Sequence, residues 1–310
     1  MKQVVFHLPE AWLSDRSQML PFYRKLVKGL KRLRIEHRIE PLDRSRILTR
    51  IDSDQSFHIV NHARIGHPRA LSAGVAYLYP FWHLDPDGIR AFSSIRGMKY
   101  DPGEIDSRAA SRFFDRLHRR HVIDRKSRYD QPRDREVIPE GCIAVFLQDE
   151  TNRIVGETTH IDRWTMLETC LAAAQDRPVV VKPHPKEISL DTMDRLVALQ
   201  ERWHQLQISL ANIHDILGAA SRVVTINSAV GVEAYMHEKP VILCGQADFH
   251  HIATEARDPV ELAEALVAPP PDVDFRRYID WYFRGQCLNA GAQDLVDQFL
   301  RRLRSRGFAS

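Results

Sequence analysis

The sequence predicts an α/β protein in which short buried strands alternate with helices, as in Rossmann-like domains. Two stretches carry this prediction. Residues 177–187, RPVVVKPHPKE, contain three valines that stop abruptly in a Lys-Pro-His-Pro turn. Residues 221–245, SRVVTINSAVGVEAYMHEKPVILCG, contain an apolar run, a helix start and a second apolar run. Short continuous apolar runs are typical of parallel strands buried on both faces, and the repeated strand–helix–strand order predicts half of a nucleotide-binding domain.

The composition indicates a folded protein large enough for two domains. The chain has 310 residues, of which 44% are hydrophobic, and about 150 residues is a usual domain size. Its 44 basic and 41 acidic residues nearly cancel, so charge does not indicate a nucleic-acid partner. No run approaches the roughly 20 apolar residues of a membrane-spanning helix, and the N-terminus lacks signal-peptide features. We therefore expect a cytoplasmic protein.

The four cysteines are far apart and form no CxxC pair. This spacing predicts reduced thiols, mostly in the core, rather than disulfides or a zinc site. The paired histidines His250 and His251 lack further ligands nearby in the sequence. We therefore expect no metal site and no cofactor.

In the first half, strands are expected over residues 4–6, 35–39, 57–61 and 73–79. Residues 21–33 show the periodicity of an amphipathic helix, and its polar face carries only basic side chains. Such a face is usually solvated, but it can also attract anionic lipid, so a peripheral contact with the inner membrane surface is an alternative. Asp85-Pro86-Asp87-Gly88 has the DxD pattern of some metal-dependent glycosyltransferases, but a Pro-Asp-Gly run first predicts a turn.

The polar, proline-bearing stretch at residues 125–139 is the best candidate for a linker. We accordingly expect an N-terminal α/β domain at residues 1–135, a Rossmann-like domain at 136–290 and a C-terminal helix at 291–310. In the second half, strands are expected at 142–147, 179–181, 208–210, 223–226 and 240–245. Helices are expected at 161–174, 190–205, 214–219, 229–237, 259–266 and 275–288.

Three groups of polar residues follow predicted strands. Lys182, His184 and Pro185 come directly after the valine run, where a cation and an imidazole can meet a phosphate at the carboxyl edge of a sheet. Proline stiffens this loop. A rigid loop with a solvated lysine fits the same residues.

Asn227 and Ser228 follow the strand at 223–226 and fit a helix N-cap, with Glu233 about one turn into the helix. The amides of a capped first turn can hold an anion. An ordinary structural cap is the alternative.

The strand at 142–147 leads into Gln148, Asp149 and Glu150. Two carboxylates at a strand end, next to a domain boundary, can act as acid, base or nucleophile. A polar loop without a catalytic role fits either carboxylate equally well.

Four motifs together resemble the bacterial capsular polysaccharide Kdo transferases. They are Leu147-Gln148 with its acidic successors, KPHP, TINSAVGVEA followed by HEKPVILCG, and the late WYFRGQCLN. The resemblance covers most of residues 142–290 and, more faintly, YLYPFWHLDPDGIRAFSSI in the first half.

This resemblance implies a GT-B-like fold, with two Rossmann-like domains facing a cleft, and metal-independent transfer of Kdo from CMP-Kdo to a lipid-linked or glycan acceptor. It implies that His184 contacts the CMP phosphate, that Ser228 and Asn227 hold it from the helix end, and that Glu233 binds a ribose hydroxyl. Gln148 and Pro185 belong to the same donor site, and Asp149 or Glu150 is the implied catalytic carboxylate.

The chain departs from the family pattern at Asn152, where the family carries an acidic residue. Two other classes therefore stay open. One is a transferase or epimerase that uses CMP-sialic acid or a UDP-sugar, and the other is a non-catalytic polysaccharide assembly or export protein with a degenerate donor site.

Overall fold

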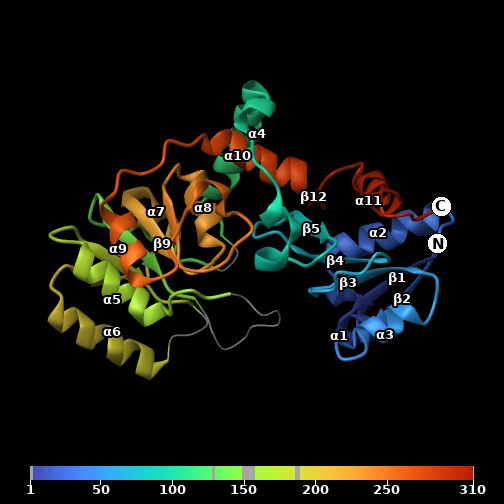
Figure 1. The fold of residues 1–310 in the computed structure, drawn as a ribbon, viewed down its shortest axis with the longest axis horizontal. Helices are drawn as coiled ribbons and strands as arrows, with labels where there is room; N and C mark the ends of the chain where they lie inside the picture. Colours follow the sequence, from blue (N-terminus) through green and yellow to red (C-terminus); the bar gives the residue numbers. More distant parts are fainter. Residues whose placement is uncertain (1–2, 128–129, 149–157, 186–188, 310) are drawn as a thin grey trace. The chain divides into compact units, whose positions relative to one another are not determined.

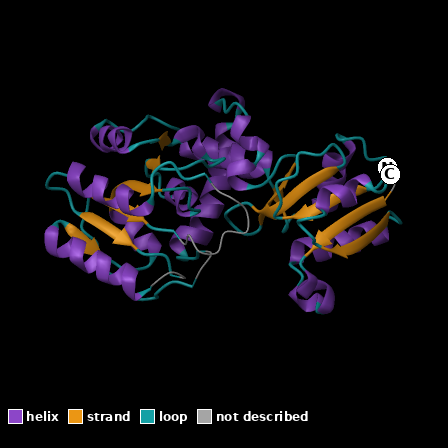
Figure 2. Ribbon diagram, turned by 60° about the horizontal axis from the view of Figure 1, so that its bottom comes forward, coloured by secondary structure: helices purple, strands orange, loops and turns teal. Residues whose placement is uncertain are grey.

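The computed structural model describes the whole chain except residues 1–2, 128–129, 149–157, 186–188 and 310. It divides into two compact units, residues 1–98 with 282–310 and residues 99–281. Each unit contains a six-stranded, mostly parallel sheet, with helices on both faces (Figure 1, Figure 2). The predicted α/β class with two Rossmann-like units is confirmed.

The first unit has the strand order β12-β5-β4-β3-β1-β2, in which β2, β1, β3 and β4 run parallel and β5 is antiparallel to both of its neighbours, β4 and β12. Its strands are β1 (Gln3–Leu8), β2 (Glu36–Pro41), β3 (Phe57–Asn61), β4 (Ala70–Val75), β5 (Phe81–Asp85) and β12 (Leu288–Asn289). Its α-helices are α1 (Glu10–Ser14), α2 (Pro21–Arg32), α3 (Ile47–Asp52) and α11 (Leu295–Arg304).

The core of the first unit lies between the sheet and the pair α2 and α11. Phe6 stacks on Phe299 of α11 with ring centroids 6.1 Å apart, and Phe22 of α2 stacks on Trp82 of β5 at 4.2 Å. The return of the chain through β12 and α11 therefore completes this unit. A smaller cluster around Ile47, Ile51 and Val60 covers the opposite face under α3.

The second unit has the strand order β11-β10-β9-β6-β7-β8, and all of its strands run parallel. Its strands are β6 (Cys142–Phe146), β7 (Val179–Lys182), β8 (Leu206–Ile208), β9 (Ala220–Thr225), β10 (Val241–Leu243) and β11 (Thr254–Glu255). Its α-helices are α4 (Ser107–His118), α5 (Arg163–Ala173), α6 (Leu190–Arg202), α7 (Ile213–Ala219), α8 (Val230–Met236), α9 (Pro259–Val267) and α10 (Phe275–Asp280).

The core of the second unit joins one face of its sheet to α5, α6 and α9. The inward-facing residues of β6, β7 and β9 alternate along each strand and pack against apolar side chains of these three helices. The pairs α7 with β6 and β9, and α8 with β9 and β10, lie in contact. The valine run predicted as a buried strand is fully buried in β7.

The units differ from the predicted domain ranges because residues 99–135 bind to the second unit. α4 packs on α10, and Arg125 forms a half-buried ion pair with Asp215 of α7, with N and O 2.6 Å apart. The side-chain amide of Asn212 also donates to the carbonyl of Pro132. The stretch predicted as a linker is therefore held by side-chain contacts that its composition does not reveal.

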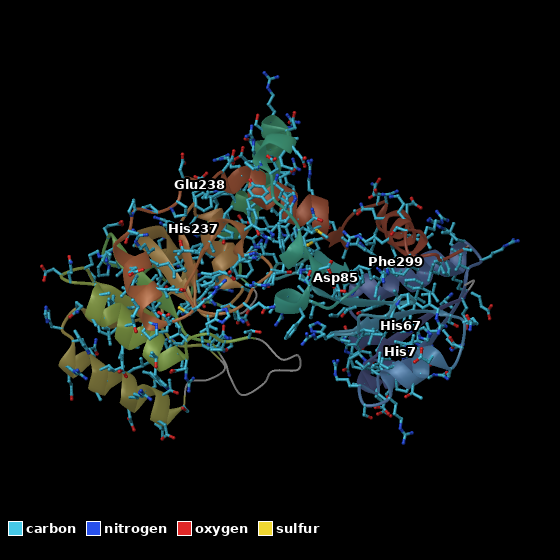
Figure 3. All side chains as sticks on the ribbon, viewed as in Figure 1. His7, His67, Asp85, His237, Glu238 and Phe299 are labelled. Atoms are coloured by element: carbon cyan, nitrogen blue, oxygen red, sulfur yellow. The ribbon has the colours of Figure 1, made fainter. Side chains whose placement is uncertain are left out.

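The carboxylate of Asp85 organises the DPDG turn that follows β5. One of its oxygens accepts hydrogen bonds from the backbone of Asp87 and Gly88, at 2.9 and 3.1 Å. The other accepts from the hydroxyls of Ser93 and Ser94, at 2.9 and 2.8 Å. The predicted turn is confirmed, and the carboxylate (Figure 3) is buried within it.

Two buried histidines connect β1 and β3 in the first unit. Asp54 accepts from Nε2 of His58 at 3.1 Å, so in a neutral ring Nδ1 of His58 accepts from Nε2 of His7, 2.8 Å away. Burial lowers the pKa of His7 from 6.5 to about 4, and the neighbouring His58 adds to the effect. Burial likewise lowers the pKa of His58.

These histidines predict that the first unit loses stability in acid. Below pH 6.5 His7 becomes protonated in the unfolded chain, whereas in the folded unit it stays neutral until about pH 4. This difference alone lowers the free energy of unfolding by about 3 kcal/mol once the pH has fallen to 4. Hydrogen exchange of the β1 and β3 amides, corrected for intrinsic rates, measures this loss. Protection that stays constant between pH 7 and 5 would contradict the prediction.

Candidate functional site

In the second sheet, the order in which the chain places its strands reverses between β6 and β9. The chain proceeds from β6 to β7 and β8 on one side, and then returns to place β9, β10 and β11 on the other. In open α/β sheets, ligands bind outside the carboxyl ends of the strands at this kind of reversal. The candidate site therefore lies where β6 and β9 end.

Three predicted site residues follow the ends of three neighbouring strands at equal distances in the sequence. Phe146 pairs with Lys182 of β7 and with Thr225 of β9. Two residues further along the three strands stand Gln148, His184 and Asn227. Because neighbouring strands are about 4.8 Å apart, the ends of β7 and β9 are separated by roughly 10 Å, a span that a nucleotide phosphate and its sugar can bridge.

The side chain of Asn227 links the segments around this edge. Its carbonyl oxygen accepts from the amide of Gln148 at 3.0 Å, and its own amide donates to the carbonyls of Thr158 and Gln246, at 3.3 and 3.1 Å. Asn227 is buried. It was predicted to cap α8, but its side chain instead joins the ends of β6 and β9 to the loop after β10.

The segment at residues 158–161 is also bound to the end of β10 by its backbone. The carbonyl of Cys244 accepts from the amides of His160 and Ile161, at 2.9 and 3.1 Å. The amide of Gln246 donates to the carbonyl of Thr158 at 3.0 Å. Sequence reasoning missed this contribution because backbone groups leave no side-chain signature.

α8 begins just after this cluster. Ala229 is its cap residue, and the hydroxyl of Ser228 accepts weakly from the amide of Val230 at 3.4 Å. Glu233 lies on α8 and is buried. Ser228 lies just before the cap residue of the helix that follows β9, so the prediction that Ser228 itself is the N-cap is wrong by one residue.

The ammonium of Lys182 is directed to the β8 side of the sheet. It donates to the carbonyls of Leu210 and Ala211, at 3.0 and 2.6 Å, and burial lowers the pKa of its amine to about 8. His184, two residues beyond β7, is half-buried, and Pro185 is exposed. Lys182 thus anchors the loop before α7.

The predicted catalytic carboxylates Asp149 and Glu150 lie outside the described residues, as does Asn152. Within the described part of the chain, no group of three or more His, Cys, Asp or Glu side chains is arranged to hold a metal ion. His251 lies beside Tyr278, with its Nδ1 3.2 Å from the phenol oxygen.

A comparison with protein families finds a match in the second unit. Residues 148–255 match the family model of capsule polysaccharide biosynthesis proteins. The resemblance predicted from the motifs is therefore confirmed over a segment that runs from Gln148, past β7 and β9, to the end of β11. No curated protein matches the chain in sequence.

Two solved structures share the fold across nearly the whole chain. The Thermosulfurimonas dismutans KpsC β-Kdo 2,7-transferase aligns with a TM-score of 0.57 and 14% identity, covering 98% of this chain and 99% of that one. The β-Kdo 2,4-transferase of the same KpsC aligns with a TM-score of 0.55 and 13% identity, covering 90% and 89%. The predicted GT-B-like fold class is confirmed.

The hydrogen bonds of the buried Asn227 amide predict how strongly two substitutions at this position destabilise the protein. Asn227→Ala should lower the free energy of unfolding by about 1–3 kcal/mol, because buried partners lose their hydrogen bonds. Asn227→Asp should cost more, because it sets a carboxylate against the carbonyls of Thr158 and Gln246. Thermal unfolding at neutral pH measures both, and an Asp variant as stable as the Asn protein would contradict the assignment.

A glycine at the end of β10 is required by close packing. A Cβ on Gly245 would stand 2.6 Å from both the Thr158 carbonyl oxygen and the Ile226 side chain. Gly245→Ala should therefore destabilise the protein by about 1–3 kcal/mol. Gly218→Ala on α7 is the matched control, because a Cβ there meets no atom within 4 Å, and it should be neutral or stabilising. Equal melting temperatures for the two variants would argue against close packing around Gly245.

Proposed function

We propose that this protein is a glycosyltransferase of surface polysaccharide (capsule) biosynthesis that transfers Kdo from CMP-Kdo to a lipid-linked or glycan acceptor. The observation that carries the proposal is the hydrogen bond between Gln148 and Asn227 at the reversal point of the second sheet, where the paired ends of β6, β7 and β9 are each followed two residues later by Gln148, His184 and Asn227. This edge lies inside the segment that matches the capsule polysaccharide family.

In this proposal the donor phosphate lies between the ends of β7 and β9. The imidazole of His184 and the hydroxyl of Ser228 contact the phosphate, while Glu233 binds a ribose hydroxyl. Gln148 and Asn227 shape the floor through their mutual hydrogen bond, and Pro185 restrains the loop. Lys182 is assigned to holding the loop beside the site and not to phosphate contact, because its ammonium donates to the carbonyls of Leu210 and Ala211.

The proposed reaction breaks the bond between C2 of Kdo and the CMP phosphate oxygen. The anomeric carbon passes through an oxocarbenium-like state, and negative charge builds on the departing phosphate. Positioned donors that meet this charge stabilise the transition state, as an oxyanion hole does. The acceptor hydroxyl forms the new bond to C2, and Asp149 or Glu150 either takes its proton or first attacks C2 and gives a covalent intermediate.

We propose donor binding without a metal and without a cofactor, and a cytoplasmic location with peripheral contact to the inner membrane. Every helix within the described residues is too short or too polar to cross a bilayer. The identity of the acceptor belongs to the same proposal. Its partners are the nucleotide sugar and a glycan or glycolipid, and no nucleic acid.

A nucleotide panel separates this proposal from its alternatives. Calorimetry with CMP, UDP, GDP and ADP should give binding for CMP and weaker binding for the others. Preference for UDP would favour a UDP-sugar transferase or an epimerase. Binding of CMP without turnover of CMP-Kdo or CMP-sialic acid would favour a non-catalytic assembly or export protein, the reading that the departure at Asn152 suggests.

His184→Ala should lower the rate of Kdo transfer by about 100-fold or more, because one donor to the developing charge is lost. Its fold should stay intact, since His184 lies half-buried in a loop. His204→Ala is the matched control, because His204 is an exposed histidine of the same unit, and it should leave the rate unchanged. Near-normal transfer by His184→Ala would remove the donor-site assignment.

A further inference from the structure

Five arginines dominate the exposed face of α4 and of the turn that follows it, on which Ser107 and Asp115 are also exposed. Arg108, Arg112 and Arg116 recur every four residues along α4, and Arg119 and Arg120 continue in the π-helical turn η5 (Arg119–Ile123). All five side chains are exposed. At 100° per residue, the first four fall within a sector of about 80°, and the stripe is about 18 Å long. We call these five residues the arginine stripe.

The rest of α4 is occupied by packing within the second unit. Ala110, Phe113, Phe114 and Leu117 are buried, and α4 lies against α10 (Figure 1). The guanidinium of Arg276, from α10, lies over the ring of Phe114 at 4.7 Å. The apolar face that secures the helix therefore lies largely opposite the arginine stripe, and Arg116 reaches it with its guanidinium 5.8 Å from the centroid of the Phe113 ring.

The charge of the arginine stripe is not compensated inside the described part of the unit. The acidic residue of α4, Asp115, is paired with Arg276 at 2.8 Å, and Arg276 also pairs with Glu238 at 3.1 Å. No ion pair of the five stripe arginines occurs among the described residues. Like charges four residues apart destabilise a helix, so folding of the unit does not account for the stripe.

We propose that the arginine stripe is a docking surface for an anionic phospholipid membrane. A row of exposed guanidinium groups is complementary to lipid phosphates, which it can bind bidentately. An anionic leaflet attracts each nearby basic residue by about fivefold in binding, or about 1 kcal/mol. The exposed Ile123 at the end of the stripe adds an apolar contact. The choice of a membrane as the occupant rests on the proposed use of a lipid-linked acceptor.

Vesicle flotation of the full-length protein tests the proposal. The protein should bind vesicles of phosphatidylcholine with phosphatidylglycerol, and much less those of phosphatidylcholine alone. The triple variant Arg108→Gln, Arg112→Gln, Arg116→Gln should lose about 100-fold in binding, the product of three single losses. The triple Arg→Lys variant should keep most of the binding, because the charge is retained.

The matched control removes the same charge from α2. Arg24, Lys28 and Lys31 are exposed basic residues of that helix, and their triple change to Gln should leave binding within a few-fold of wild type. An equal loss from the α2 variant, or no loss from the α4 variant, would overturn the proposal. The proposal would also be overturned if the α4 triple variant bound vesicles as well as wild type but had lost binding to an acidic polysaccharide. The arginine stripe would then bind a glycan and not a membrane.

These outcomes are distinguishable from failure of the transferase assignment. Vesicle binding needs no nucleotide, and CMP binding by calorimetry needs no vesicle. A stripe variant that still binds CMP but no longer floats supports membrane docking whatever sugar is transferred. Its melting temperature should not fall, since the substitutions remove repulsion between neighbouring arginines.

Discussion

The side chain of Asn227 is the interaction on which the carboxyl edge of the second unit depends. One buried amide group receives a hydrogen bond from Gln148 and gives two to the carbonyls of Thr158 and Gln246. Only a side chain with both an acceptor and two donors can make this set. The ends of β6 and β9 and the loop after β10 are thereby joined at the edge where the strand order reverses.

This arrangement bears on residues 149–157, which lie between two of Asn227's partners in the sequence. Gln148 precedes that segment and Thr158 follows it, and both are bound to the same amide group. The predicted carboxylates Asp149 and Glu150 are one and two residues from Gln148. If the proposed function holds, a catalytic carboxylate one or two residues from the hydrogen-bonded Gln148 loses less entropy on reaching a substrate than one further along the sequence.

The sequence predicted the second unit more fully than the first. A parallel strand buried on both faces appears in the sequence as a continuous apolar run, as in β7 (Val179–Lys182). Where such a run ends, the polar residues at the carboxyl edge of the sheet can be predicted. β12 was missed because two residues carry no periodicity, and the predicted helix at 275–288 instead ends before Leu288 pairs with Trp82 of β5. Contacts such as Arg125 with Asp215 join distant parts of the chain and have no local pattern.

The position of Lys182 refines how the site can meet a phosphate. A strand-end lysine predicts a cation for the ligand, but an ammonium has three protons, and two of them go to the carbonyls of Leu210 and Ala211. At most one remains for any other acceptor. Lys182 therefore acts mainly by holding the loop beside the site and by the field of its charge. Under the proposed function, direct contact with a donor phosphate is assigned to His184 and to the hydroxyl and amides near the start of α8.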